Sequence, residues 1–282
     1  MAWLTVVSRC RDNRNQDLRT MADAPLPIVL VASGTATAAS ATYHQIEAEC
    51  RRRLPDHPVH WAYSSRAIRR RMRTKTGEAP ATPEKVLQQL SRSGCRRAVV
   101  QSLHLICGIE FHHLVWQTAR CPLEVHLGLP LLAHPEDFDA VLDWVEGIRP
   151  TAAEEALVLV GHGTEHPAWM AYALLAQGLA ARFGHQVLLG QVKGDPAPAT
   201  IAKRLSAGGY RRVHLRPFML VAGAHFMQDI SGRRPTSWQS QLEEHGLTVL
   251  PQAEGMGSHP ATSSLFCRHI KEALRRPPLH FD

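Results

Sequence analysis

The sequence predicts an α/β protein made of two Rossmann-like parallel-sheet domains, and three observations support this fold class. Short runs rich in Val, Ile and Leu alternate with longer amphipathic stretches along the 282 residues. Continuous apolar runs of this length are typical of strands that are buried on both faces of a parallel sheet. The chain also contains an internal repeat, and its length suits two domains of ordinary size.

Eight apolar runs are the predicted strands, and amphipathic patterns between them are the predicted helices. The strands lie at residues 27–33, 58–64, 97–103, 123–129, 156–162, 186–192, 212–220 and 247–252. The helical patterns lie at residues 42–54, 83–94, 135–148, 168–184 and 197–209. Regular alternation of strands with helices is the pattern of an α/β fold with crossover connections.

Two pairs of segments carry the internal repeat. Residues 28–35, IVLVASGT, resemble residues 157–164, LVLVGHGT. Residues 96–114 resemble residues 211–229, and the two matches occur in the same order. The second match places Glu110 opposite His225. We therefore expect two copies of one four-strand unit related by internal pseudo-symmetry.

The repeat suggests how the chain is divided. We expect a disordered N-terminal extension at residues 1–24, an N-terminal half at 25–150, and a C-terminal half with a C-terminal helix at 151–282. The chain has 44% hydrophobic and 20% charged residues, which is enough apolar material for a real core and excludes a disordered chain.

Charge and cysteine content bound the partners and the compartment. The formal net charge of +7 favours acidic partners. Six cysteines without a CxxC pair, and no secretion signal, indicate free thiols in the cytoplasm. No stretch approaches the roughly 18 apolar residues that a membrane-spanning helix needs, so we expect no membrane partner.

A strongly basic run covers residues 65–77, with its charges at helical spacing. It is interpreted as a solvated face or as a surface that attracts an anionic substrate. Nucleic-acid binding usually adds stacking aromatic residues, but aromatic residues are only 6% of this chain. We therefore expect no nucleic-acid partner.

Three polar residues follow predicted strands at the edge where ligands bind in open α/β sheets. His162 ends the first strand of the second repeat, between two glycines that allow a sharp turn. Glu110 and His225 lie just past the third strand of their repeats. Two imidazoles and a carboxylate are a suitable set for a divalent metal and for proton removal.

Other interpretations of these residues stay open. His162 and His166 have the spacing of a helical zinc pair, but Gly163 and Pro167 favour a loop instead. The GHGT segment could bind phosphate, although it lacks the lysine of such loops. His225 and Glu110, taken alone, would be ordinary surface residues, as would most of the cluster of His104, His112 and His113.

A set of motifs in fixed order resembles a known family. The segments PIVLVASGT, AVVQSLHLICGIEFHHL, LVLVGHGTEHPA and LRPFMLVAGAHFMQDISG are among those that carry the resemblance, which covers about residues 27–275. Together they resemble the anaerobic-type sirohydrochlorin cobalt chelatase family. The resemblance implies the class II chelatase fold, with two Rossmann-like halves related by pseudo-symmetry, which agrees with the internal repeat.

The resemblance implies a metal-insertion reaction, in which Co2+ is a substrate and no organic cofactor takes part. Sirohydrochlorin, a tetrapyrrole, would lie between the halves, and a homo-oligomer is compatible with the sequence. His162 would be the proton acceptor and a metal ligand, with His225 and Glu110 as further ligands. The expected substrate-binding residues are Ser33, Gly34, Thr35, Ser102, His104, Gly163 and Lys193.

One position departs from the family pattern. The family commonly has a glutamate of the metal site where this chain has Lys193, and an ammonium group opposes metal binding. Glu110 could complete the site, Asp195 could substitute, or metal insertion could be impaired. The last outcome would leave a tetrapyrrole- or metal-binding protein that kept the fold, and a chelatase for Ni2+ or Fe2+ is a further alternative.

Overall fold

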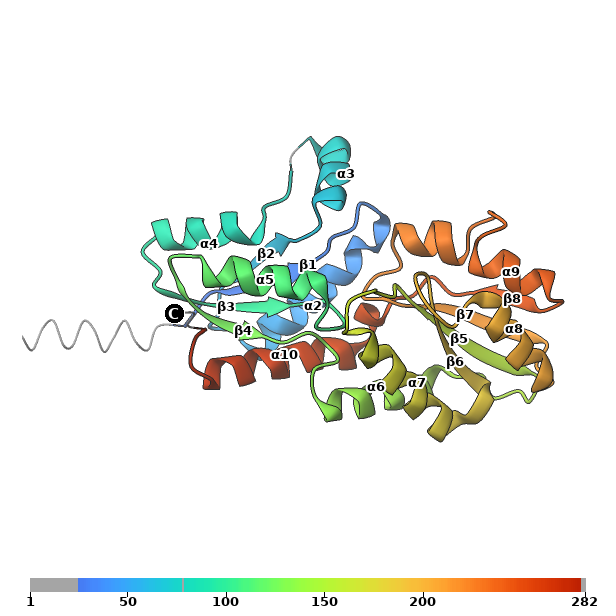
Figure 1. The fold of residues 1–282 in the computed structure, drawn as a ribbon. Helices are drawn as coiled ribbons and strands as arrows, with labels where there is room; N and C mark the ends of the chain where they lie inside the picture. Colours follow the sequence, from blue (N-terminus) through green and yellow to red (C-terminus); the bar gives the residue numbers. More distant parts are fainter. Residues whose placement is uncertain (1–24, 78, 280–282) are drawn as a thin grey trace, which may run out of the picture.

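The computed structural model describes residues 25–77 and 79–279 (Figure 1). The extension expected at residues 1–24 therefore lies outside the described residues. In the part of the chain that is described, none of the helices has the length and apolar character needed to cross a bilayer.

Two parallel four-stranded sheets form the centre of the two halves. The first contains β1 (Ile28–Ala32), β2 (Val59–Tyr63), β3 (Arg97–Ser102) and β4 (Glu124–Gly128), in the order β2-β1-β3-β4. The second contains β5 (Glu155–Gly161), β6 (Val187–Gln191), β7 (Arg212–Phe218) and β8 (Thr248–Pro251), in the order β6-β5-β7-β8. The identical strand order confirms the predicted α/β fold with two copies of one unit.

The alternation of buried residues along the strands explains why helices cover both faces of the first sheet. Ile28 and Leu30 of β1 belong to a core under α2 (Ala41–Arg53), whereas Val29 and Val31 belong to a core under α4 (Pro83–Arg92) and α5 (Ile109–Ala119). The basic run forms α3 (Arg66–Thr76), which projects from the body of the first half (Figure 1).

The second sheet is covered in the same way. Helix α7 (Trp169–Phe183) packs on one face, and α8 (Pro198–Ala207) and α9 (Trp238–Glu244) pack on the other. Four short helical turns complete the described chain: 3-10 turns at Ala38–Ser40, Gly184–Gln186 and Met256–Ser258, and a π-helix at Phe226–Ile230.

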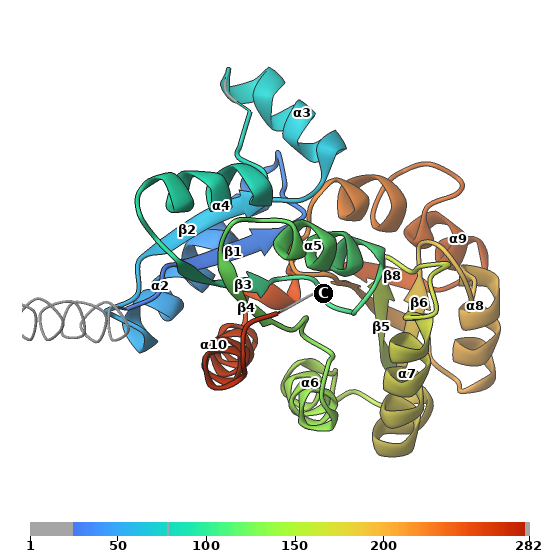
Figure 2. The same ribbon diagram turned by 60° about the vertical axis from the view of Figure 1, so that its left-hand side comes forward.

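Two helices leave the half that precedes them in the chain and pack on the other half. Helix α6 (Pro135–Ile148) follows β4 but packs against α7, and α10 (Pro260–Arg275) follows β8 but packs against α2, β3 and β4 (Figure 2). One core cluster therefore contains Ile28 and Leu30 from the first sheet together with Leu157 and Leu159 from the second. The two sheets are held together by this shared apolar core.

A buried polar network joins the two exchanged helices. The Asp137 carboxylate at the start of α6 is fully buried and accepts hydrogen bonds from the backbone N–H groups of Ala133, at 3.0 Å, and His134, at 2.7 Å. It also contacts the Arg268 guanidinium, and the His269 ring lies 3.0 Å away. The other His269 ring nitrogen lies 3.0 Å from the carbonyl of Leu129.

Two acceptor groups face the ring of His269. One is the backbone carbonyl of Leu129 and the other is the carboxylate of Asp137. Burial alone would raise the pKa of Asp137, but the hydrogen bonds and positive charge of His269 lower it overall, with help from the backbone of His134 and Ala133. The network is therefore a buried ion pair that fixes α10 against α6.

We expect Asp137→Asn to destabilise the protein by about 3 kcal/mol, because it leaves buried cationic groups without their counter-charge. The depressed pKa of Asp137 stabilises the fold above the carboxyl pKa of the unfolded chain, and this contribution is lost as the pH falls through the folded-state value. Urea unfolding at several pH values measures both effects, with the exposed Asp139→Asn on the same helix as control. Equal stability of the two variants at neutral pH would contradict the prediction.

Candidate active site

The turn after β5 holds His162 in place through a very close backbone contact. Gly163 has a φ of +76°, and a Cβ atom there would lie 1.7 Å from the carbonyl oxygen of Lys193. The backbone N–H of Lys193 in turn donates to the carbonyl oxygen of His162 at 3.0 Å. Only glycine fits this approach, so the two strand-end loops lie in direct contact beneath the His162 side chain.

The hydrogen bond of His162 shows which ring nitrogen is free. Its Nδ1 lies 3.0 Å from the carbonyl oxygen of Gly163, so Nδ1 carries the proton and Nε2 keeps a lone pair. Burial lowers the pKa of His162, and the nearby His225 and Lys193 lower it further, against the hydrogen bond to Gly163 and the charge of Asp229. The ring is therefore neutral at neutral pH and can bind a metal or accept a proton.

His225 has the same arrangement on the opposite loop. It immediately precedes the π-helix after β7, and its Nδ1 lies 2.7 Å from the Oδ2 atom of Asp229, one turn further along. The carboxylate accepts, so Nδ1 donates, and Nε2 is the ring nitrogen left for a ligand. A histidine that donates its second N–H to a carboxylate is the usual arrangement of a metal ligand. The side chain is 47% exposed, so it is accessible from solvent.

The structure brings these two imidazoles together. The ring centroids of His162 and His225 lie 4.8 Å apart, with the ring planes at 81°. Two imidazoles at this separation suit borderline divalent ions such as Co2+, Ni2+ and Zn2+. The pair lacks thiolates, so it would hold such an ion without the strength of a structural metal site.

Glu110 lies in the first turn of α5, and within residues 25–77 and 79–279 no hydrogen bond or ion pair joins it to either imidazole. Its charge acts on His104, whose pKa it raises slightly against the larger effect of burial. The structure thus places Glu110 with the residues at the end of β3, and its role as a metal ligand stays a prediction.

The residues at the end of β3 form a small polar network. The Nδ1 atom of His104 lies 2.9 Å from the Ser102 hydroxyl, and its Nε2 atom lies 3.3 Å from the Ser64 hydroxyl. Burial lowers the pKa of His104 to about 4, so this ring is neutral at any pH at which the protein would act. Sequence reasoning named Ser102 and His104 but missed Ser64.

The loop after β1 contacts the loop that carries His225. A Cβ at Gly223, two residues before His225, would lie 3.2 Å from the Thr35 hydroxyl. Gly34, with a φ of +97°, packs against Tyr63 and against Ile68 of α3. The expected substrate-binding segment at Ser33, Gly34 and Thr35 therefore lies between the second imidazole and the basic helix.

A histidine bridge joins the two halves beside these loops. The Nδ1 atom of His112 on α5 lies 3.0 Å from the Nε2 atom of His166, which belongs to the loop of His162. His166 accepts the backbone N–H of Ala168 at its Nδ1, so its Nε2 carries the proton and donates to His112. The bridge thus needs both rings neutral, and His166 is occupied here rather than paired with His162.

Lys193 and Asp195 lie on the loop after β6, and both are exposed. The ammonium charge of Lys193 is close enough to lower the pKa of His162. The backbone carbonyl of Asp195 accepts a hydrogen bond from the Gln191 side chain. Within the described ranges, no hydrogen bond or ion pair joins the Asp195 carboxylate to His162 or His225, so its role as a substitute ligand also stays a prediction.

A second group of potential metal ligands lies elsewhere, at the contact of α6 with α10. His134, His269 and Glu272 place one ligand atom each within 4.8 Å of one another. Both ring nitrogens of His269 are already used by Leu129 and Asp137. We therefore assign this group to the structural ion-pair network.

The sequence offered one unused signal for the site. Asp229 follows His225 by four residues, which is the spacing that places two side chains on one face of a helix. The contact of Ser64 with His104 and the contact of His166 with His112 had no such signal, because each joins distant parts of the chain.

We expect Lys193→Glu to strengthen divalent metal binding about fivefold, because it replaces a repelling charge near the imidazoles by an attracting one in a solvent-exposed position. Calorimetric titration with Co2+ measures the affinity. Lys203→Glu on α8 makes the same charge change on an exposed helix and is expected to leave the affinity unchanged. Equal affinities of all three proteins would show that the Lys193 charge does not reach the metal.

Known proteins resemble this chain along most of its length. Residues 27–275 match the family model described as Cobalt chelatase (CbiK). The sirohydrochlorin cobaltochelatase of Salmonella typhimurium is 33% identical over 225 residues, which cover 78% of this chain and 84% of that protein. Sirohydrochlorin cobaltochelatase CbiKC of Nitratidesulfovibrio vulgaris is 31% identical over 255 residues, which cover 88% and 90%.

A solved structure agrees in fold. SirB from Bacillus subtilis with Fe3+ superimposes with a TM-score of 0.60 at 15% identity, over 88% of this chain and 95% of that one. This likeness supports the class II chelatase fold of two parallel four-stranded sheets. With the family match over residues 27–275 and two curated relatives above 30% identity, the chain belongs to the cobalt chelatase (CbiK) family.

Proposed function

We propose that this protein is a sirohydrochlorin cobaltochelatase, an enzyme that inserts Co2+ into the tetrapyrrole sirohydrochlorin. The observation that carries the proposal is the pair of imidazoles, His162 and His225, with ring centroids 4.8 Å apart at the strand ends of the second sheet. Family membership over most of the chain supplies the reaction class and the substrate.

The two imidazoles perform different parts of the reaction. The Nε2 atoms of His162 and His225 hold Co2+ beside the macrocycle. A pyrrole N–H is a poor acid, so it loses its proton only as the metal replaces the positive charge. The Nε2 lone pair of His162, released by the departing metal, then accepts that proton. The low pKa of His162 keeps this lone pair available below the ordinary histidine range.

The surrounding loops have the chemistry to bind a polycarboxylate macrocycle. Helix α3 carries exposed arginines and docks on the loop of Gly34, next to Thr35 and the second imidazole. The backbone of Gly163 and the hydroxyl groups of Ser33 and Ser102 would complete the substrate contacts, with the neutral His104 as a hydrogen-bonding group. Glu110 would act as a further carboxylate beside His104.

A second candidate function is a tetrapyrrole- or metal-binding protein without turnover. Lys193 favours it, because its charge lowers the pKa of His162 and therefore also opposes a metal cation at the same place. Mixing the protein with sirohydrochlorin and Co2+ and following the visible spectrum separates the two functions. Conversion faster than the spontaneous reaction supports the enzyme, whereas a shifted but static spectrum supports a carrier. The same assay with Ni2+ and Fe2+ measures the metal preference.

We expect His162→Ala to lower the rate of metal insertion by about a hundredfold or more, because it removes both a metal ligand and the proton acceptor. The initial rate of formation of the cobalt product measures this loss. His185→Ala changes an exposed histidine of the same half and is the control. A His162→Ala variant with the parental rate would show that another group accepts the proton.

We expect His112→Ala to lower kcat/KM about fivefold, because it removes one neutral hydrogen bond that holds the α5 loop against the His162 loop. His113→Ala replaces the neighbouring exposed histidine and is expected to retain the parental value. Separate measurement of kcat and KM shows whether the bridge acts on substrate binding or on the chemical step. Matching values for the two variants would contradict a role for the bridge.

A further inference from the structure

Two buried cysteines lie in contact far from the imidazole pair. Cys50 belongs to the last turn of α2 and Cys267 to α10, and their Sγ atoms are 3.6 Å apart. The residues are 217 positions apart in the sequence, and both are almost completely buried. A disulfide needs a sulfur–sulfur distance of about 2.05 Å, so the two side chains would have to approach by only about 1.5 Å.

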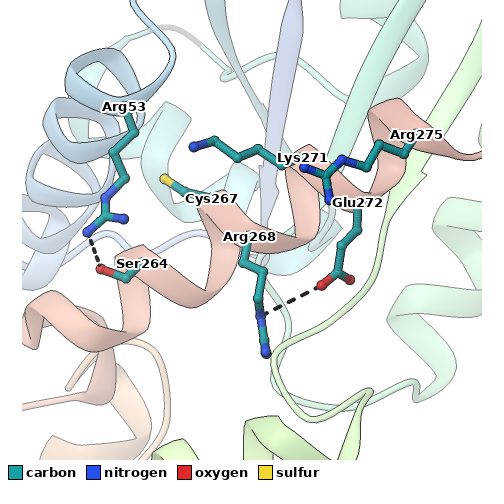
Figure 3. A pocket seen from close by; sticks show the side chains of 7 residues that line it. All are labelled: Arg53, Ser264, Cys267, Arg268, Lys271, Glu272 and Arg275. Carbon is teal, nitrogen blue, oxygen red and sulfur yellow. Dashed lines mark hydrogen bonds and ion pairs between the residues drawn. The ribbon is translucent and has the colours of Figure 1, made fainter.

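A basic pocket opens beside Cys267. Its volume is about 300 Å³, and it is lined by Arg53, Ser264, Cys267, Arg268, Lys271, Glu272 and Arg275 (Figure 3). Figure 3 shows the Cys267 sulfur pointing between Arg53 and the Lys271 ammonium group. Within the described residues, neither Lys271 nor Arg275 forms an ion pair with a carboxylate, so the pocket has an excess of positive charge.

The charges around the pair divide the roles of the two sulfur atoms. The hydrogen bond with Cys50 lowers the pKa of the Cys267 thiol, and Arg53 and Lys271 lower it further against the effect of burial. The pKa of Cys50 is raised by the same hydrogen bond and by its own burial. Cys267 lines the basic pocket and Cys50 does not, so Cys267 is the sulfur that meets a reagent in the pocket and attacks it as a thiolate.

We propose that Cys50 and Cys267 form an oxidisable dithiol site, and that the basic pocket admits an anionic small-molecule disulfide to it. A glutathione-type disulfide has the required chemistry, because it combines a sulfur–sulfur bond with carboxylates that the pocket attracts. A buried pair of cysteines that only fills the core would need no adjacent cationic opening. The site is independent of the metal-insertion reaction.

The reaction proceeds by two thiol–disulfide exchanges. The Cys267 thiolate attacks one sulfur of the small disulfide, a mixed disulfide forms on Cys267, and one small thiolate leaves. Cys50 then gives its proton to that thiolate and attacks the Cys267 sulfur, and the second small thiolate leaves. The second small thiolate takes up the proton that Cys267 lost when it ionised. The net change therefore converts the protein dithiol and one small disulfide into a protein disulfide and two small thiols.

The first experiment uses the full chain carrying Cys10→Ser, because Cys10 lies outside the described residues. The protein is incubated with glutathione disulfide, quenched with acid, alkylated and mapped by mass spectrometry. We expect a cross-linked peptide pair joining Cys50 to Cys267. Cys95, Cys107 and Cys121 are internal controls, since each is partly exposed and the described residues place no second sulfur beside them. Modification of these three while Cys50 and Cys267 stay reduced would overturn the proposal.

Single substitutions test the order of events. Cys50→Ser is expected to stop at the mixed disulfide on Cys267, whereas Cys267→Ser is expected to leave Cys50 unmodified. The reverse pattern would overturn the assigned roles.

If either variant folds poorly, the thermal melting curve of the parent protein gives a second measurement. The cross-link closes a long loop between α2 and α10, so it is expected to raise the melting temperature by several degrees, and a reductant is expected to reverse the shift.

The last experiment tests the pocket. Lys271→Gln is expected to slow the reaction with glutathione disulfide by about threefold to tenfold, because it removes a charge beside the attacking sulfur. The reaction with the neutral hydroxyethyl disulfide is expected to change much less. Lys85→Gln removes an exposed lysine of α4 outside the pocket and should leave both rates unchanged. Equal slowing of both reagents by Lys271→Gln would show that charge does not guide the oxidant.

Discussion

The contact between Gly163 and the carbonyl group of Lys193 is the constraint on which the site depends. Two strand-end loops can meet at this distance only where one of them has no Cβ atom. Gly161, two residues earlier, has a similar limit, because a Cβ there would lie 2.6 Å from the Tyr172 ring. A residue with a Cβ atom therefore does not fit at the position before or after His162 without a shift of its neighbours. The glycines on each side of His162 are part of the site because of the space they leave.

The imidazoles of His162 and His225 differ in the group that accepts the hydrogen bond from Nδ1. His162 donates to a neutral carbonyl, whereas His225 donates to the carboxylate of Asp229. A carboxylate partner increases the electron density of the ring more strongly, so in the proposed reaction His225 would be the stronger of the two ligands. His162 is the more buried of the two, and its burial lowers its pKa, so in the proposed reaction it would be the weaker ligand. This difference suits a reaction in which one group keeps the ion until the other has accepted a proton.

Much of the fold could be predicted because the strands are buried on both faces and read as continuous apolar runs. Helix α5 could not be predicted from the spacing of its apolar residues. Phe111, Leu114 and Thr118 are buried at helical spacing, but Ile109 and Trp116 are apolar and exposed, so the pattern is blurred. The π-helix after His225 has no signal in the residue pattern. The exchange of α6 and α10 was not predicted, because the apolar period of a helix shows that it has a buried face and not which sheet covers it.

The site was predictable to the extent that it follows strand ends. His162 and His225 stand at matching edges of parallel strands, so the fold alone brings them near one another. Glu110 follows a strand of the other sheet, and its distance from them depends on how the two sheets are packed. The bridge from His112 to His166 and the hydroxyl of Ser64 on His104 depend on the same packing. Local sequence does not contain that information.

The crossing of α6 and α10 means that neither half is an autonomous folding unit. A fragment that ended near residue 150 would retain the first sheet but lose the helix that covers β3 and β4. The complementary fragment would carry α10 with no surface to pack on, and it would lack the helix that packs against α7. Each half therefore completes its apolar core only when the other half is present. Cleavage of the connecting segment is expected to leave the two pieces associated, because neither is an independent domain.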